Sequence, residues 1–337
     1  MSVSSLVASA PRIELAHLPT PLEPMERLTA ALGGPEIWVK RDDCTGLGIG
    51  GNKVRKLEYV MADAVASGAD TVIGVGVPQS NAVRQTAAAA ARLGLGCRLL
   101  LLTGRVPGTD RDYETSGNVL LDRLLGAEVE FVPWGADVAA EVRARVERLE
   151  ADGHRPYPLP YGISNGLGAL GYARFAVELA GQLEGVGIDA SAVVMAAGSG
   201  GTQAGAVLGM GEVLPGTRLV GIDVDAEPDR VRGDVLAVAA ELAALAGVPE
   251  PEPSAVEVVG GYAGPGYGVP TDGMVEAVRT AARLEGLLLD PVYTGKAFAG
   301  MLDLVRQGRW GSGDRVVFVH TGGTPALFAY RAAFDEA

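Results

Sequence analysis

The sequence predicts an α/β fold built on parallel sheets. The β-rich run Thr71 to Val77 precedes a helical stretch from Ser80 to Leu93. Ala192 to Ala196 likewise precedes Gly201 to Met210. Such alternation is typical of parallel strands joined by crossover helices. Glycine is a further indication, because 48 of 337 residues is about twice the usual share of roughly 7%. We therefore expect many tight turns or close contacts between backbone and ligand.

Further segments extend this pattern along the chain. The other β-rich runs are Ile37 to Lys40, Cys97 to Leu102, Glu128 to Val132, Arg218 to Val224 and Arg315 to His320. Ala87 to Ala91 and Ala237 to Ala246 predict closely packed helices, because alanine has the highest helix propensity. Proline and glycine make Pro249 to Pro270 too irregular for a helix and predict a long functional loop. His154 to Gly171 is a candidate crossing between domains.

Composition narrows the function classes. A chain with 48% hydrophobic residues is long enough for one large or two medium domains. Its net charge of −13 disfavours nucleic acid and anionic membranes as partners. Cys44 and Cys97 are the only cysteines and have no metal-ligand spacing, so we expect no metal site and a reducing cytoplasm. Met1 to Ala10 lacks the features of a signal peptide, and no run approaches the roughly 20 apolar residues of a membrane span.

A glycine-rich loop, Gly46 to Gly51, leads to Lys53 and a helix from about Val54 to Ser67. The positive end of a helix disfavours an ammonium group and so lowers the pKa of a lysine there, as an imine-forming amine requires. The alternative is that Lys53 is an ordinary solvated lysine. We expect Lys56 to be an ordinary lysine that forms an ion pair.

The tripeptide Gln79-Ser80-Asn81 follows a β-rich run and begins a helix. Free backbone N–H groups and polar side chains at the carboxyl edge of a sheet suit a substrate carboxylate. Alternatively, Ser80 only caps its helix. Capping and binding of a substrate are compatible roles.

The segment Gly198 to Gly205 is a second glycine-rich turn after a β-rich run. Converging N–H groups and a helix N-terminus predict a phosphate site. The segment has neither the lysine of a Walker loop nor the glycine spacing of a dinucleotide fingerprint.

Taken together, these segments resemble the fold type II pyridoxal phosphate enzymes, and among them the D-cysteine desulfhydrase and 1-aminocyclopropane-1-carboxylate deaminase family. The resemblance covers nearly the whole chain. It is carried by Leu18 to Leu22, Val39 to Asp43, Gly50 to Leu57, Gln79 to Asn81, Gly198 to Thr202, Tyr262 to Gly268, Asp290 to Lys296 and His320 to Gly323.

The resemblance implies a two-domain α/β fold of the tryptophan synthase β type, with parallel twisted sheets flanked by helices. We expect a large cofactor-binding domain of residues 1–50 and 165–337 and a small domain of residues 51–164. The cofactor is expected in the cleft between them. The resemblance also implies a homodimer.

It further implies roles for individual residues. Lys53 would hold pyridoxal 5'-phosphate as a Schiff base, Asn81 would face the ring hydroxyl, and Thr294 would meet the pyridine nitrogen. Ser80, Tyr267 and Tyr293 join Lys53 as expected catalytic residues. The expected phosphate ligands are Gly198, Ser199, Gly200, Gly201 and Thr202. The expected substrate contacts are Gln79, Ser80, Asn81 and Thr321.

Two positions favour β-elimination within the family. The deaminases have a glutamate where this chain has Thr294, and a leucine where it has Thr321. A neutral hydroxyl provides a weaker electron sink than a carboxylate beside the pyridine nitrogen. One position departs from the desulfhydrases, which often have histidine where this chain has Ala82.

The sequence thus predicts a lyase acting on a small amino acid, first of all conversion of D-cysteine to pyruvate, ammonia and sulfide. One alternative is an L-cysteate sulfo-lyase or another lyase of β-substituted alanines. A second is 1-aminocyclopropane-1-carboxylate deaminase. A third, of another class, is a non-catalytic phosphate-binding α/β protein.

Overall fold

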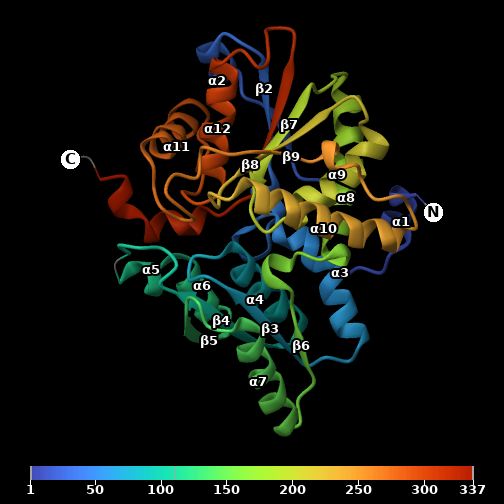
Figure 1. Cartoon of the computed structure of the whole chain (residues 1–337), viewed down its shortest axis with the longest axis vertical. Coiled ribbons are helices and arrows are strands. Elements are labelled where there is room, and N and C mark those ends of the chain that lie inside the picture. Colours follow the sequence, from blue (N-terminus) through green and yellow to red (C-terminus); the bar gives the residue numbers. More distant parts are fainter. Residues whose placement is uncertain (1, 110, 336–337) are drawn as a thin grey trace.

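Two sheets organise the chain (Figure 1). The computed structural model describes residues 2–109 and 111–335. In this part of the chain, the larger sheet has six strands in the order β1-β2-β10-β7-β8-β9, and the smaller has four in the order β5-β4-β3-β6. All neighbouring strands are parallel except β1 and β2. The α/β fold with parallel sheets is confirmed.

Helices cover both faces of the larger sheet. Its strands are β1 (Leu22–Pro24), β2 (Glu36–Lys40), β7 (Ala192–Ala197), β8 (Arg218–Asp223), β9 (Glu257–Val259) and β10 (Arg315–Val319). One face packs on α1 (Val3–Ser9), α8 (Gly166–Val186), α9 (Gly201–Val213) and α10 (Pro228–Ala246). The other packs on α2 (Glu26–Leu32), α11 (Asp272–Glu285) and α12 (Thr294–Arg306).

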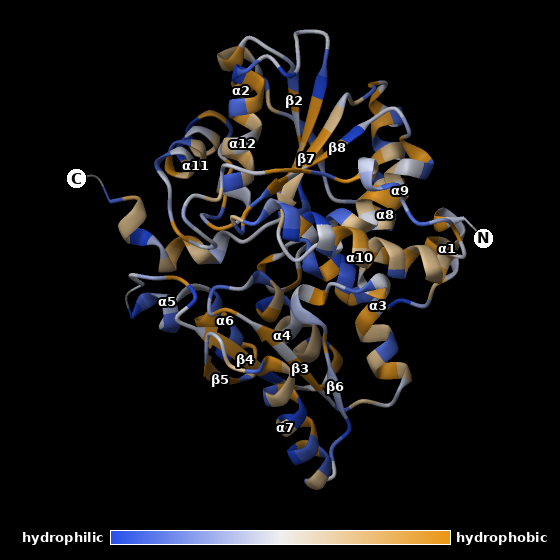
Figure 2. Ribbon diagram, in the orientation of Figure 1, coloured by the Kyte–Doolittle hydropathy of each residue, from blue (hydrophilic) through white to orange (hydrophobic). Residues whose placement is uncertain are grey.

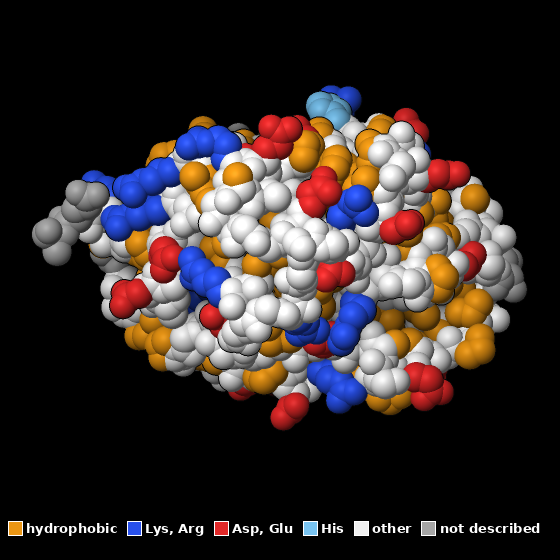
Figure 3. All heavy atoms as spheres, turned by 90° about the horizontal axis from the view of Figure 1, so that it is seen from above, with side chains coloured by type: hydrophobic (Ala, Val, Ile, Leu, Met, Phe, Trp, Pro, Cys, Tyr) orange, Lys and Arg blue, Asp and Glu red, His pale blue; other side chains and the backbone are white. Residues whose placement is uncertain are grey.

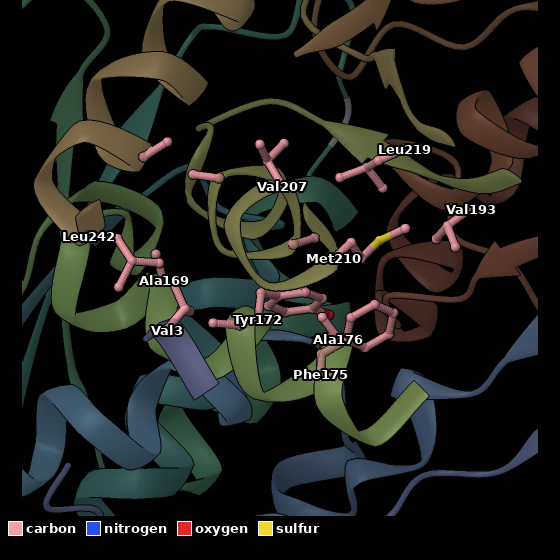
Figure 4. Packing of buried hydrophobic residues seen from close by; sticks show 14 of the residues in the cluster. Val3, Ala169, Tyr172, Phe175, Ala176, Val193, Val207, Met210, Leu219 and Leu242 are labelled. Atoms are coloured by element: carbon pink, nitrogen blue, oxygen red, sulfur yellow. The ribbon is translucent and has the colours of Figure 1, made fainter. Parts of the chain in front are cut away.

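Alternation along β7 divides the core between these two faces. Val193 and Met195 point into the cluster of α8, α9 and α10, whereas Ala192 and Val194 join the cluster of α11 and α12. Because side chains of a strand alternate between faces, one continuous apolar run supplies both clusters. Figure 4 shows Val193 facing Met210 and Phe175 in the first of them.

The smaller sheet is also built of crossover units. Its strands are β3 (Thr71–Gly76), β4 (Gly96–Thr103), β5 (Glu128–Pro133) and β6 (Pro156–Pro158). The associated helices are α3 (Lys53–Ala66), α4 (Asn81–Leu93), α5 (Asp112–Thr115), α6 (Gly117–Leu124) and α7 (Val138–Ala151). Helix α3 packs against α4 and also against α8, a helix that covers the larger sheet.

The seven β-rich runs of the sequence all form strands. The three short strands β1, β6 and β9 were not predicted from the sequence. The stretch from Pro249 to Pro270 contains only β9 and a short 3₁₀ turn, Pro253–Ala255, as regular elements. The division into domains at residues 50 and 164 stays a prediction.

Apolar segments gather in the strands and on the inner sides of the helices (Figure 2). On the face drawn in Figure 3, acidic and basic side chains are interspersed. Within the described ranges, no helix is both long and apolar enough to cross a membrane.

Candidate active site

A cavity of about 890 Å³ lies where the carboxyl ends of strands from both sheets meet. Its volume is within the range of about 300 to 1,000 Å³ that is common for small-molecule sites. It brings together most of the residues expected from the sequence. These are Lys53, Ser80, Asn81, Gly198, Ser199, Gly200, Thr202, Tyr267, Tyr293 and Thr321.

Lys53 is the first residue of α3 and is placed by the compact glycine loop before it. Gly50 has a positive φ of 70°, and a Cβ atom there would lie 2.0 Å from the carbonyl oxygen of Asp43. Only glycine fits this turn. Burial is the main cause that lowers the pKa of Lys53 from 10.5 to about 8, and a hydrogen bond with Lys56 opposes it. About a tenth of the amine is therefore neutral at pH 7, far more than for an ordinary lysine, and covalent attachment to an aldehyde requires this form.

Lys56 lies one turn further along α3 and is fully buried. Its Nζ donates hydrogen bonds to the carbonyl oxygen of Gly162 at 2.9 Å and to the Ser164 hydroxyl at 3.0 Å. Burial and the neighbouring Lys53 hold the pKa of Lys56 well below its usual value. The prediction that Lys56 is an ion-pairing lysine is wrong, because its partners are neutral oxygens.

The turn between β7 and α9 has the geometry of an anion site. Gly200 has a φ of 81°, and a Cβ atom there would lie 2.8 Å from the backbone of Asp234. The first N–H groups of a helix lack partners within the helix and attract anions. A Cβ atom on Gly201 would lie 2.7 Å from Nζ of Lys56, so this amino group lies directly behind the turn. The turn thus combines helix N–H groups with a buried amine.

Side chains around the turn are mutually hydrogen-bonded. The Thr202 hydroxyl accepts a hydrogen bond from Nδ2 of Asn52 at 3.0 Å. The hydroxyl groups of Ser199 and Ser164 are 2.9 Å apart. These bonds orient the polar wall that faces Lys53. The half-buried amine of Lys53 and an anion-binding turn in one cavity fit the two ends of pyridoxal phosphate.

Ser80 and Asn81 stand at the start of α4 and also line the cavity. The Ser80 hydroxyl accepts a hydrogen bond from the backbone N–H of Ala82 at 3.2 Å and so caps the helix. Oδ1 of Asn81 accepts from Arg84, and its Nδ2 donates to the carbonyl oxygen of Thr321 at 3.4 Å. The capping interpretation of Ser80 is confirmed, while its catalytic role stays a prediction.

Arg84 is a residue that the sequence analysis missed. It is fully buried and donates hydrogen bonds to the carbonyl oxygens of Gly48 and Gly50 and to Asn118. It therefore ties the loop ahead of Lys53 to the helix that carries Asn81. The visible sequence signal is an arginine near the start of an alanine-rich helix that has a second arginine, Arg92, near its end.

Tyr267 and Tyr293 both line the cavity and contact each other. Their hydroxyl groups are hydrogen-bonded, and their rings meet edge to face with centroids 5.8 Å apart. Burial raises the pKa of both tyrosines above the usual value of 10. Both hydroxyls are therefore neutral at physiological pH and able to donate protons.

Three expected site residues lie outside the cavity lining: Gln79, Gly201 and Thr294. Gln79 is buried and donates to the carbonyl oxygens of Tyr113 and Ser116. The Thr294 hydroxyl donates to Oδ1 of Asp290 at 2.7 Å and accepts from the backbone N–H of Asp290 at 2.8 Å. Their assigned contacts with ligands stay predictions.

Comparison with known proteins agrees with this cavity. A family model described as "Pyridoxal-phosphate dependent enzyme" matches residues 13–322. The chain belongs to this family of pyridoxal-phosphate dependent enzymes. The recognition made from sequence motifs is thereby confirmed.

Curated members of the family are similar over nearly their full length. A protein named D-cysteine desulfhydrase from Salmonella newport (strain SL254) is 46% identical over 324 residues, which are 95% of this chain and 96% of that protein. A protein of the same name from Salmonella typhi is 45% identical over the same shares.

Solved structures agree in fold. A crystal structure described as that of the ACC deaminase homologue superposes with a TM-score of 0.87 at 36% identity, covering 99% of this chain and 98% of the other. Threonine deaminase isoform 2 from Solanum lycopersicum superposes with a TM-score of 0.69 at 18% identity, over 98% and 87%. The latter likeness concerns the fold alone.

Proposed function

We propose that this pyridoxal-phosphate dependent enzyme is a lyase that converts D-cysteine to pyruvate, ammonia and sulfide. The main structural support is the opening of Lys53 into the same cavity as the 198–202 turn. The names of its relatives with 45–46% identity support the substrate.

Lys53 would hold the cofactor through Nζ. Gly198 to Thr202 would hold the phosphate group, with Lys56 behind them. Asn81 would lie beside the ring, with its amide orientation set by Arg84. When bound, pyridoxal phosphate supplies an electron sink for negative charge at the substrate α-carbon.

The remaining work falls to side chains of the cavity. Ser80 and the N-terminal N–H groups of α4 would bind the substrate carboxylate. With a pKa of about 8, Lys53 can take a proton at Nζ from the α-carbon. The neutral hydroxyl groups of Tyr267 and Tyr293 can give a proton to the departing sulfur.

Deamination of 1-aminocyclopropane-1-carboxylate is the second candidate, and the structure described as an ACC deaminase homologue favours it. Thr294 and Thr321 argue against it, since the deaminases carry glutamate and leucine there. L-cysteate and other β-substituted alanines remain alternative substrates of the lyase. The reason is that this chain has Ala82 in the cavity, where many desulfhydrases have a histidine.

One product assay separates these candidates. D-cysteine, L-cysteine, L-cysteate, 3-chloro-D-alanine and the cyclopropane amino acid are each incubated with enzyme reconstituted with pyridoxal phosphate. We expect pyruvate and sulfide to form fastest from D-cysteine. 2-Oxobutanoate from the cyclopropane amino acid as the main product would instead identify a deaminase. A protein that stays colourless after reconstitution and desalting would favour the non-catalytic alternative.

The double variant Thr294→Glu, Thr321→Leu tests our account of these two positions. We expect the rate of β-elimination to fall in this variant relative to the rate of ring opening. Because a glutamate would lie beside Asp290, the melting temperature of the variant must be measured in parallel. An unchanged product preference in a folded variant would refute the account.

We also propose a cytoplasmic homodimer. Leu120 and Leu124 on α6 are exposed, as is Phe328 in the neighbouring 3₁₀ segment Thr324–Ala329. Such an apolar surface supports self-association. Light scattering after gel filtration tests this: Leu124→Glu with Phe328→Glu should yield monomers, and a monomeric wild type would refute the proposal.

A further inference from the structure

Arg105 links the two sheets at the cavity. It follows β4 of the smaller sheet and forms an ion pair with Asp225, which follows β8 of the larger sheet. Figure 1 shows these strands in the lower and upper halves of the molecule. Both side chains line the cavity and are largely buried, at 16% and 10% exposed. An ion pair so shielded is less screened than one on the open surface.

The guanidinium group of Arg105 also lies over two aromatic rings. Its central carbon is 4.5 Å from the ring centroid of Trp134 and 4.1 Å from that of Tyr267. Trp134 follows β5 of the smaller sheet, whereas Tyr267 belongs to the long loop after β9. Arginine suits this position because its planar cation stacks on rings while it pairs with a carboxylate.

Asp225 is itself held in place on its own side of the cavity. Its backbone N–H donates to Oδ1 of Asp223 at 2.8 Å, and its carboxylate also pairs with Arg230 of α10. Arg230 pairs in turn with Asp234 at 2.6 Å. Arg105 is therefore the part of this network that crosses from the smaller sheet to the larger.

We propose that Arg105 is a positioning residue with two separable effects. By stacking on Tyr267, it holds that ring where its hydroxyl meets Tyr293. By pairing with Asp225, it restricts the entrance through which solutes reach Lys53. This inference rests on the proposed function, because it assumes that Lys53 carries the cofactor.

Two substitutions separate these effects. Asp225→Asn removes the ion pairs of Asp225 with Arg105 and Arg230 and leaves Arg105 stacked on the rings. Arg105→Lys keeps the positive charge and loses the planar group that stacks on Tyr267. Arg218→Gln is the matched control, since Arg218 is a paired but exposed arginine at the opposite end of β8.

Access to Lys53 is measured with hydroxylamine on the reconstituted holoenzyme. Hydroxylamine displaces the Lys53 amine from the aldehyde carbon, which forms an oxime, frees the amine and abolishes the visible absorbance band. We expect Asp225→Asn to react about five-fold faster than the wild type or more, because, of its two lost ion pairs, only the one with Arg105 joins the two sheets. Added salt should raise the wild-type rate toward that of Asp225→Asn and leave the variant unchanged.

Positioning of Tyr267 is measured by steady-state kinetics with D-cysteine. We expect Arg105→Lys to lower kcat about ten-fold with a smaller change in KM and an intact visible band. The Arg218→Gln control should match the wild type in both assays. Equal hydroxylamine rates in the wild type and Asp225→Asn, or an unchanged kcat in Arg105→Lys, would overturn the corresponding half of the inference. A wild type without a visible band would overturn the proposed function instead, and the inference with it.

Discussion

Gly201 and Lys56 are in contact through the wall of the cavity: a Cβ atom on Gly201 would lie 2.7 Å from Nζ of Lys56. The same atom would lie 2.7 Å from the Ser164 hydroxyl. No side chain fits at residue 201 unless these groups move. Burial and Lys53 hold the pKa of Lys56 down, and an anion at the turn would favour the charged form of this amine, so the two would stabilise each other.

Gly201→Ala should therefore weaken the binding of pyridoxal phosphate. We expect the dissociation constant to rise about ten-fold or more, because the alanine methyl group displaces Lys56. Titration of apo-protein followed by visible absorbance measures it. Gly211→Ala in the same helix is the control, since a Cβ atom there meets nothing within 4 Å. The control should bind as the wild type does and gain up to about 1 kcal/mol of stability. Equal affinities in both variants would contradict this role of Lys56.

The lowered pKa of Lys53 predicts a pH profile for attachment of the cofactor. Only the neutral amine attacks an aldehyde, so the rate should rise with pH and level off near 8, whereas an ordinary lysine would keep gaining up to 10.5. Stopped-flow absorbance after mixing apo-protein with pyridoxal phosphate measures this rate. A profile that still rises steeply above pH 9 would show that burial does not lower the pKa of Lys53 as described.

Arg84→Lys should weaken cofactor binding without abolishing folding. Lysine keeps a cation but cannot donate at once to Gly48, Gly50, Asn81 and Asn118, as the guanidinium group does. We expect about ten-fold weaker binding and a shifted visible band, because the amide of Asn81 is then free to turn. Fluorescence and absorbance titrations of the apo-protein, with circular dichroism as the folding control, measure both. A variant with wild-type affinity and spectrum would refute the positioning role of Arg84.

We expect Asp122 to make the stability of the protein dependent on pH. Its two carboxylate oxygens are buried and have no hydrogen-bond partner among the described residues. Burial raises the pKa of Asp122 from 3.8 to about 8. Between these values the folded state keeps a proton that the unfolded state has released, so the free energy of unfolding falls as pH rises.

Asp122→Asn should remove this dependence. Relative to the wild type, we expect the variant to gain about 2 kcal/mol between pH 5 and pH 8, roughly half of the about 3.6 kcal/mol that the pKa shift implies over this pH range. Urea unfolding at the two pH values measures the difference. A stability difference that is the same at both would mean that Asp122 is charged throughout.

The main strands could be predicted from the sequence because most are apolar runs flanked by glycine or polar residues, and β5 alternates polar and apolar residues. The strands β1, β6 and β9 could not, because each has only three residues and two of them contain proline. So short a segment has no measurable period, and its pairing is decided by tertiary packing.

The site could be predicted from the sequence where glycine-rich turns or a helix cap form it. Glycine loops before Lys53 and α9, and a serine cap on α4, point to ligand contacts from local sequence alone. Lys56, Arg84 and Arg105 gave no such signal, because their partners Gly162, Gly48 and Asp225 lie 106, 36 and 120 residues away. Thr294 carries a polar group suited to a ligand, but its hydroxyl is engaged by Asp290 four residues earlier.

Peptide mapping after borohydride reduction tests the central claim most directly. The holoenzyme is reduced, digested and analysed by mass spectrometry, with Lys53→Ala as the control. We predict one pyridoxyl group per chain, on Lys53, and none in the variant. A label on Lys56 or Lys296, the two buried lysines beside the site loops, or a protein without any label, would contradict the account.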